Sequence, residues 1–310
     1  MRAIIFPGQG SQYIGMGLDL YDKFDLVKKI FDKVDKTLGF SLSDIIFNGP
    51  EIKLKETKYT QPAIMVVGVS IFNVLKYNFN INFNESKFFA GHSLGEYTAL
   101  VCANSITLEK ATYLLHERGK AMQESVPIGQ GSMIAVLGMT VEEVEKEINL
   151  LPKTGTCEIA NDNCIGQVVV SGDKAIIDNL NTNIKAKRKK GIMLPVSAPF
   201  HCSLMTKASE YMNEKITNTN FSKPSPSIIS NVTAKEESDT DKIKTLLIDQ
   251  ITSRVRWRES VEYMIKKGVT DFLEIGPGKV LSGLVKKIDK NVKIKNINSF
   301  EDINCYRKND

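Results

Sequence analysis

The fold is decided by residues 88–103, which read FFAGHSLGEYTALVCA. An apolar run enters the pentapeptide 91–95, Gly-His-Ser-Leu-Gly, and a second apolar run leaves it. A short strand that passes into a helix through G-x-S-x-G is a nucleophile elbow, whose strained turn holds a serine oxygen clear of the backbone. The following helix directs free N–H groups and its positive dipole end toward any oxygen that the serine attacks. Ser93 is therefore the candidate nucleophile, although the same pentapeptide also occurs as an ordinary turn.

The composition is that of a soluble enzyme with a large core. Of the 310 residues, 42% are hydrophobic and 25% are charged, which allows one large domain or two unequal ones. No apolar run approaches the length of a membrane span, and the apolar start ends at Pro7, too early for a signal peptide.

Cysteine and charge content argue against several classes of protein. The five cysteines are widely spread and have no C-x-x-C spacing, which argues against a disulfide framework and against a zinc site. A net charge of +5 is too mild for a nucleic-acid-binding surface but suits an acidic partner. We therefore expect a cytoplasmic, metal-free monomer that binds neither nucleic acid nor a membrane.

Residues 3–6 are continuously apolar, as in a strand buried on both faces of a parallel sheet. The loop 7–12, Pro-Gly-Gln-Gly-Ser-Gln, follows. It is not a dinucleotide fingerprint, because Tyr13 occupies the position of the required last glycine. The flanking glycines let the backbone amide of Gln9 approach a substrate, or else the loop is only a tight turn.

A helix predicted from residue 108 to residue 122 carries an arginine on its apolar stripe. Arg118 lies four residues after Leu114 and four before Met122. A guanidinium that faces the core is costly unless an anion meets it. The side chain could snorkel to solvent, pair with a carboxylate of the protein, or hold a substrate carboxylate bidentately. His116 is off the stripe, and we expect it in solvent.

Residues 128–197 change to short alternating patterns, which predict the order β-α-β-β-α-β of a ferredoxin-like unit. The strands are expected at residues 133–137, 157–160, 167–171 and 192–196, with helices from residues 140 and 174. The fold class is α/β: an α/β-hydrolase-like parallel-sheet core, residues 1–127 and 198–310, with an inserted ferredoxin-like subdomain, residues 128–197. The basic run at residues 185–190 is either a solvated face or a docking site for an acidic partner.

His201 is the only credible base for the serine among three histidines. His92 precedes the nucleophile on the same turn and points elsewhere, and His116 sits on a polar helix face. A positioned imidazole can take the hydroxyl proton and return it to a leaving group.

The remaining helices and strands are expected to be scaffold. Residues 18–38 and 61–72 read as helices, residues 228–231 as a strand, residues 243–251 as a helix and residues 270–279 as a strand, turn and helix. The tail after Ser299 is expected to fray.

Five motifs together resemble malonyl-CoA:acyl carrier protein transacylases, the acyltransferases of type II fatty acid synthesis. They occur in the order of that family, at residues 6–12, 91–96, 117–119, 197–201 and 274–278. The resemblance implies that malonyl-CoA and acyl carrier protein are the substrates, with no metal or redox cofactor. It also implies a ping-pong reaction through a malonyl-serine.

The resemblance also implies roles for individual residues. Ser93 would be acylated with His201 as its base, and the amides of Gln9 and Leu94 would form the oxyanion hole. Arg118 would hold the malonyl carboxylate. Further substrate contacts would come from Phe200, where a branch on the malonyl group would lie, and from Met122; the backbone carbonyl of Gln250 would orient the base.

One departure from that family concerns the loop after Gln250. A proline usually precedes Val-Arg-Trp, whereas residues 253–257 read Ser-Arg-Val-Arg-Trp, with Arg254 before the valine.

Two rival functions share part of the pattern. An esterase or thioesterase has the same elbow but usually a late histidine held by an acid side chain, and no histidine follows His201. A non-catalytic module that binds a carrier protein would form no acyl-enzyme.

Overall fold

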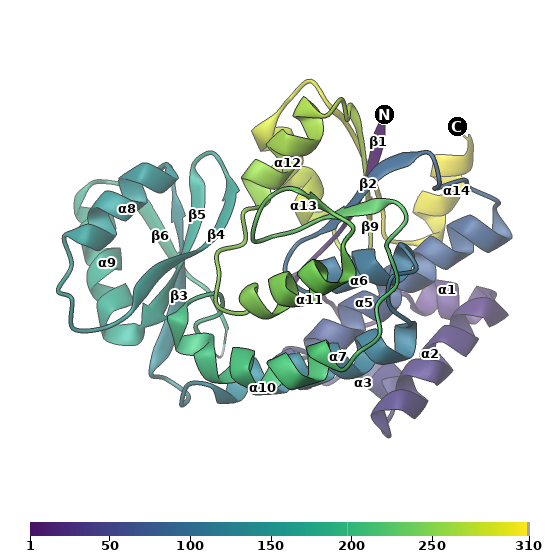
Figure 1. Ribbon diagram of the computed structural model, residues 1–310, viewed down its shortest axis with the longest axis horizontal. Coiled ribbons are helices and arrows are strands. Elements are labelled where there is room, and N and C mark those ends of the chain that lie inside the picture. Colours follow the sequence, from purple (N-terminus) through teal and green to yellow (C-terminus); the bar gives the residue numbers. More distant parts are fainter. Residues whose placement is uncertain (197, 309–310) are drawn as a thin grey trace.

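Two β-sheets organise the chain in the computed structural model, which describes residues 1–196 and 198–308 (Figure 1). The larger sheet has the spatial strand order β10 (Lys293–Ile297), β9 (Asp271–Ile275), β1 (Arg2–Phe6), β2 (Ser86–Gly91), β7 (Ser227–Ile229) and β8 (Glu236–Glu237). Neighbouring strands are parallel except at the β7–β8 edge, which is antiparallel. The predicted parallel-sheet core is confirmed.

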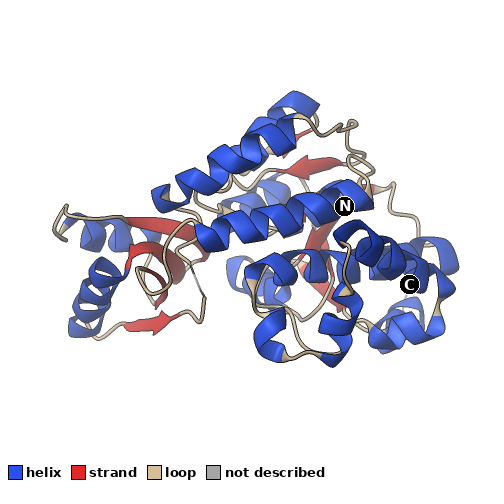
Figure 2. Ribbon diagram, turned by 90° about the horizontal axis from the view of Figure 1, so that it is seen from below, coloured by secondary structure: helices blue, strands red, loops and turns tan. Residues whose placement is uncertain are grey.

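Strand β1 is buried on both faces because helices cover each side of the sheet (Figure 2). Ile4 and Phe6 face one layer, and Ala3 and Ile5 face the other, as the alternation of a strand requires. The first layer contains α1 (Leu18–Lys23), α2 (Asp25–Leu38), α3 (Leu42–Asn48), α4 (Glu51–Leu54), α5 (Thr57–Asn73), α6 (Gly95–Cys102), α7 (Leu108–Glu124), α10 (Thr206–Thr217), α11 (Thr240–Asp249) and α14 (Phe300–Lys308). The second contains α12 (Trp257–Lys266) and α13 (Val280–Ile288).

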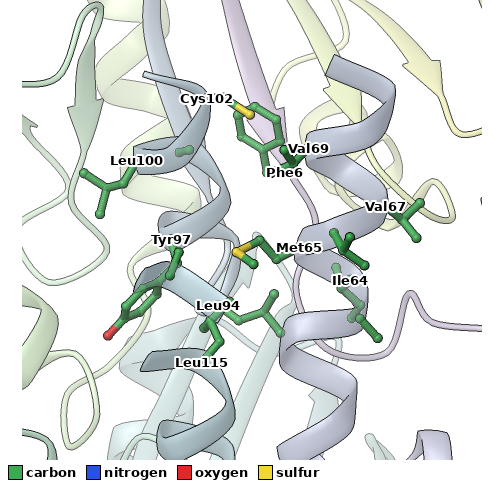
Figure 3. Close-up of a cluster of buried hydrophobic side chains, with 14 of the residues drawn as sticks. Phe6, Ile64, Met65, Val67, Val69, Leu94, Tyr97, Leu100, Cys102 and Leu115 are labelled. Carbon is green, nitrogen blue, oxygen red and sulfur yellow. The ribbon is translucent and has the colours of Figure 1, made fainter. Parts of the chain in front are cut away.

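Helices α5, α6 and α7 pack together beside the sheet and set the position of the elbow. Figure 3 shows Met65 of α5 directed toward Leu94, at the start of α6, and Leu115 of α7. All three side chains are fully or almost fully buried. A short π-helical turn, Val74–Asn78, extends α5. The residue after the elbow serine is thus anchored in the core, which limits movement of the turn.

The smaller sheet has the strand order β4 (Cys157–Cys164), β5 (Gln167–Asp173), β3 (Gly131–Leu137) and β6 (Lys190–Met193), antiparallel throughout. Helices α8 (Val141–Asn149) and α9 (Lys174–Ala186) cover it and share its own apolar core. The chain order β3-α8-β4-β5-α9-β6 confirms the ferredoxin-like prediction, including the capping box of Thr140 and Glu143. The strand expected over residues 192–196 lies instead at β6, and residues 194–196 leave the sheet.

Residues 18–38 are predicted as one helix, and the structure divides them into α1 and α2. The two helices meet at Phe24, whose backbone is extended, with φ −126° and ψ 116°. Its ring packs against the rings of Phe79 and Phe300, with centroid distances of 6.0 and 5.7 Å. The break accompanies this contact between distant parts of the chain, which overrides the local helical pattern.

The expectation of a frayed tail after Ser299 is wrong. Residues 300–308 form α14, in which Ile303 and Tyr306 are buried in the main core. The Asp302 N–H donates to the Ser299 hydroxyl at 3.1 Å, and this N-cap is a helix signal that the sequence already carried. The N–H of Phe300 also donates to Asp19, at 2.6 Å. Across the described residues, no helix is long and apolar enough to cross a membrane.

The packing of α14 makes a prediction about stability. Ile303→Ala should lower the free energy of unfolding by about 2–5 kcal/mol, because it leaves a cavity at a fully buried site. The matched control is Ile128→Ala, at a side chain that is 87% exposed, which should change stability by less than about 0.5 kcal/mol. Urea unfolding curves measure both, and equal small effects would show that α14 does not belong to the core.

Candidate active site

The elbow holds Ser93 in a left-handed backbone conformation, with φ +53°. Strand β2 ends at Gly91 and α6 begins at Gly95, so the chain reverses within three residues. A Cβ on Gly91 would lie 1.9 Å from the carbonyl carbon and oxygen of Gly95, which only glycine avoids. A non-glycine residue in this conformation costs about 1–3 kcal/mol and persists only where its surroundings enforce it.

Two side chains form hydrogen bonds with the backbone of Ser93, one with its N–H and one with its carbonyl. Asn231, just after β7, accepts the Ser93 N–H at 2.6 Å and donates to the Gly91 carbonyl at 2.7 Å. Gln250, just after α11, donates from Nε2 to the Ser93 carbonyl at 3.1 Å. The strained turn is thereby fixed by residues more than 130 positions away. Sequence reasoning missed Asn231, because no local pattern links it to the elbow.

The structure places His201 against Ser93. Its Nε2 lies 2.8 Å from Ser93 Oγ, and its Nδ1 lies 2.8 Å from the backbone carbonyl of Gln250. A carbonyl only accepts, so Nδ1 carries the proton and Nε2 offers its lone pair to the serine hydroxyl. His201 also has a positive φ, +59°, so both partners of this contact are held in uncommon backbone conformations.

The imidazole of His201 is held in its neutral form. Burial, followed by the positive charge of Arg118, lowers the pKa of His201 to about 3, far below the ordinary value of 6.5. Both causes disfavour the imidazolium. The ring is therefore unprotonated, with the lone pair of Nε2 available, at any pH near neutrality.

Arg118 is 1% exposed, which rules out a snorkelling side chain. Its NH1 donates to Gln61 Oε1 at 2.8 Å and its NH2 to Gln250 Oε1 at 2.9 Å. The same NH2 lies 3.3 Å from Ser93 Oγ. Among residues 1–196 and 198–308, no carboxylate forms an ion pair with it, and its Nε has no hydrogen-bond partner. A full positive charge is therefore buried beside the serine with only neutral acceptors.

These groups open into a cavity of about 230 Å³. Ser93, His201 and Arg118 all line it, together with Gln9, Gln12, Lys55, Gln61, Met122, Met133, Asn161, Leu194, Phe200 and others. Met122 and Phe200 are buried in its wall. The side-chain oxygen of Asn161 is buried without a partner in the described part of the chain, so a polar group in the cavity could bond to it.

Gln9 lines the cavity together with Ser93, and Leu94 directly follows the serine in the elbow. Gly8 brings the first loop close, since a Cβ there would meet the His92 carbonyl oxygen at 2.6 Å. Leu94 is the N-cap residue of α6, where the helix dipole is positive. Within the described ranges, neither amide N–H donates to another protein group. Two free donors near a nucleophile can stabilise an oxyanion.

Among the described residues, the other two histidines do not contact the Ser93 hydroxyl, although His92 also lines the cavity. His92 Nε2 contacts Asn163 Oδ1 at 2.9 Å, so it points away from the serine hydroxyl, as expected. His116 was expected in solvent, which is wrong: it is half-buried, and its Nδ1 contacts the carbonyl of Lys58 at 3.0 Å. Its ring packs near Phe40, 5.5 Å between centroids, and this apolar neighbour explains the burial.

The loop after Gln250 keeps a defined path without the proline. The Val255 N–H donates to the Ala160 carbonyl at 2.8 Å, and the Asp162 N–H donates to the Val255 carbonyl at 2.9 Å. Arg254 lies 3.6 Å from carboxylate oxygens of Glu145 and Glu259. Strand β4 therefore holds the loop through its backbone. Ser197, the first residue of the motif before His201, lies outside the described residues.

The chain is similar to known acyltransferase sequences along almost its whole length. Residues 3–309 match the model of the family described as acyl transferase domain. Malonyl CoA-acyl carrier protein transacylase of Staphylococcus aureus (strain MSSA476) is 41% identical over 310 residues, covering 99% of both chains. The protein of the same name from Bacillus subtilis (strain 168) is 41% identical over 297 residues, covering 94% of this chain and 91% of its own.

Solved structures share the fold. An acyl-carrier-protein-S-malonyltransferase from Bartonella henselae superposes with a TM-score of 0.96 at 41% identity, covering 99% of this chain and 98% of that one. A malonyl-transacylase in complex with its type II PKS acyl-carrier protein superposes with a TM-score of 0.95 at 35% identity, covering 100% and 99%. Similarity of this extent covers both sheets.

The neutral imidazole makes a prediction about pH. The rate of Ser93 labelling by a fluorophosphonate should stay flat from pH 8 to below pH 6.5, because His201 becomes protonated only as the pH approaches its lowered pKa. In Arg118→Leu the acid limb should move up toward pH 6.5 without reaching it, since burial remains. Ser93→Ala is the unlabelled control. A limb at pH 6.5 in the unaltered protein would contradict the burial and tautomer of His201.

Proposed function

Because the chain belongs to the acyl transferase family, we propose that it transfers the malonyl group of malonyl-CoA to the phosphopantetheine thiol of acyl carrier protein. Relatives that cover the full chain carry the name of this activity, and one structural neighbour is bound to a carrier protein. The product would be the malonyl thioester that fatty acid synthesis consumes.

One observation carries the choice of acyl group. The guanidinium of Arg118 is buried 3.3 Å from the serine oxygen, and no carboxylate of the described residues forms an ion pair with it. A buried cation is unfavourable until an anion meets it. An acyl group that itself ends in a carboxylate supplies that anion, and the planar guanidinium suits a two-point contact. Malonyl satisfies this requirement, and acetyl does not.

In the first half-reaction, His201 Nε2 accepts the proton of Ser93 Oγ, which attacks the thioester carbonyl carbon. The negative charge that forms on the carbonyl oxygen is stabilised by the amides of Gln9 and Leu94. The C–S bond then breaks, and the thiolate of coenzyme A takes the proton from His201. The Gln250 carbonyl keeps the imidazole in the tautomer that this step requires.

In the second half-reaction, the phosphopantetheine thiol takes the place of coenzyme A. His201 accepts its proton, the sulfur attacks the malonyl-serine carbonyl, and the bond to Ser93 Oγ breaks. The serine oxygen recovers the proton from His201, so the enzyme returns to its starting state. Phe200 and Met122 line the space that the acyl group occupies in both half-reactions, and Phe200 restricts branching at the carbon beside the carbonyl.

The rival functions fit the site less well. In an α/β-hydrolase an acid side chain holds the imidazole, whereas here a backbone carbonyl does so. A buried guanidinium beside the nucleophile also has no purpose for an uncharged ester. A module that only binds a carrier protein would not need a serine and a histidine 2.8 Å apart.

The same proposal extends to domains, cofactors and compartment. Residues 1–127 and 198–310 would form the catalytic unit and residues 128–197 the inserted one, a division supported by the separate apolar core of the smaller sheet. Serine, imidazole and amides account for every bond change, so the two substrates suffice. Cytoplasmic location is supported by Cys102, Cys157, Cys164 and Cys202, which form no disulfide among the described residues.

The role of Arg118 is tested with two donors. Arg118→Ala should reduce kcat/KM for malonyl-CoA by a factor of about 30 to several thousand, as expected for loss of a buried charge contact worth about 2–5 kcal/mol. Transfer of acetyl from acetyl-CoA should hold or rise, because an unpaired cation no longer lies beside an uncharged acyl group. Rates of acyl carrier protein acylation measure both, with melting temperature as the check on folding.

The chemical step is checked by intact mass after exposure to malonyl-CoA. The unaltered protein should gain one malonyl group, and Ser93→Ala should gain none while remaining folded. Equal losses for both donors in Arg118→Ala, together with a lower melting temperature, would contradict the carboxylate contact. A malonyl adduct on Ser93→Ala would contradict the nucleophile.

A further inference from the structure

A carboxyl group lies buried directly behind the site without lining the cavity. Glu96, in the first turn of α6, is 1% exposed. Its Oε2 accepts two hydrogen bonds, one from the backbone N–H of Asn231 at 3.1 Å and one from Gln250 Nε2 at 2.7 Å. It does not contact Ser93 Oγ, His201 or Arg118 directly in the described structure. A buried carboxyl with such partners has a structural or positioning task.

The contacts of Gln250 allow only one orientation of its side-chain amide. Nε2 faces three acceptors, which are Glu96 Oε2, the Ser93 carbonyl at 3.1 Å and Asn231 Oδ1 at 3.4 Å. Oε1 faces the Arg118 guanidinium, from which it accepts at 2.9 Å. A flipped amide would set an oxygen against three oxygens and an NH2 against a cation. The shortest of the three contacts that forbid this flip is the one to Glu96.

Among the described residues, the guanidinium donates to two amide oxygens, those of Gln250 and Gln61, and more distantly to the Ser93 hydroxyl at 3.3 Å. Because no ion pair orients the guanidinium, its orientation depends on the hydrogen bonds that it donates to these acceptors. Glu96 therefore reaches Arg118 through a single intervening side chain. The Glu96 carboxyl oxygen accepts from the Gln250 amide N–H, and the oxygen of the same amide accepts from the Arg118 guanidinium.

We propose that Glu96 is a positioning residue for donor selection, which acts through the side-chain amide of Gln250 to hold the Arg118 guanidinium in the direction that a malonyl carboxylate requires. The proposal rests on the proposed function. It assigns Glu96 no contact with substrate, and it separates two tasks of Gln250: its backbone carbonyl orients the base, and its side chain orients the cation.

The test is a double-mutant cycle read as the ratio of kcat/KM for malonyl-CoA to that for acetyl-CoA. Glu96→Ala should lower this ratio about 10- to 100-fold, mainly through a higher KM for malonyl-CoA, as for loss of a hydrogen bond to a charged group. Gln250→Ala, which keeps the backbone carbonyl, should lower it by a similar factor. The double variant should be no lower than Gln250→Ala alone, because both changes break the same path.

Two conservative variants separate position from charge if Glu96→Ala fails to fold. Glu96→Gln keeps an acceptor oxygen at the same reach and should keep the ratio within about threefold. Glu96→Asp keeps the carboxyl group but is shorter by one methylene, so it should lower the ratio. The proposal would be overturned if Glu96→Gln lowered the ratio more than Glu96→Asp. It would also be overturned if the losses in the double variant were multiplicative, or if kcat/KM fell equally for both donors.

Failure of this inference can be told apart from failure of the proposed function. If the unaltered protein transfers malonyl and Arg118→Ala loses only that donor, the function stands whatever Glu96 does. If the unaltered protein forms no malonyl-serine, the proposed function is lost, and the role of Glu96 with it.

Discussion

The buried positive charge of Arg118 is the constraint on which the site depends. Two glutamine oxygens and the serine hydroxyl surround it, and none of them carries a charge. Burial lowers the pKa of the guanidinium, which shows how unfavourable its surroundings are for a cation. Hydrogen bonds to Gln61 of α5 and to Gln250 after α11 hold the side chain in place. After burial, the same charge is the second cause that lowers the pKa of His201, so one residue bears on both the acyl preference and the state of the base.

The backbone is also strained at two residues of the site. Ser93 and His201 both adopt positive φ, and they approach each other from segments 108 residues apart. Asn231 and Gln250 hold the serine turn from both sides, and Gln250 also meets the imidazole and the guanidinium. Catalytic geometry of this kind needs a rigid frame, which the parallel sheet and the buried start of α6 provide.

The sequence predicted those features whose signals are local. The elbow, the arginine on an apolar stripe and the β-α-β-β-α-β order all follow from spacing within a few tens of residues. The grip of Asn231 on Ser93 and the link between Glu96 and Gln250 join residues 138 and 154 positions apart, so no periodicity reveals them. The break at Phe24 depends in the same way on Phe300. The last helix differs, because its N-cap is a local contact between Ser299 and Asp302 that a sequence pattern can reveal.

The pKa of His201 in two acyl-enzymes tests the central claim most directly. If the malonyl carboxylate neutralises Arg118, it removes the second cause of the lowered pKa, and acetyl leaves that cause in place. NMR titration of the His201 imidazole in malonyl-Ser93 and acetyl-Ser93 protein should therefore give a higher pKa for the malonyl form. Equal values in the two forms would contradict the claim that the substrate brings the missing counter-charge.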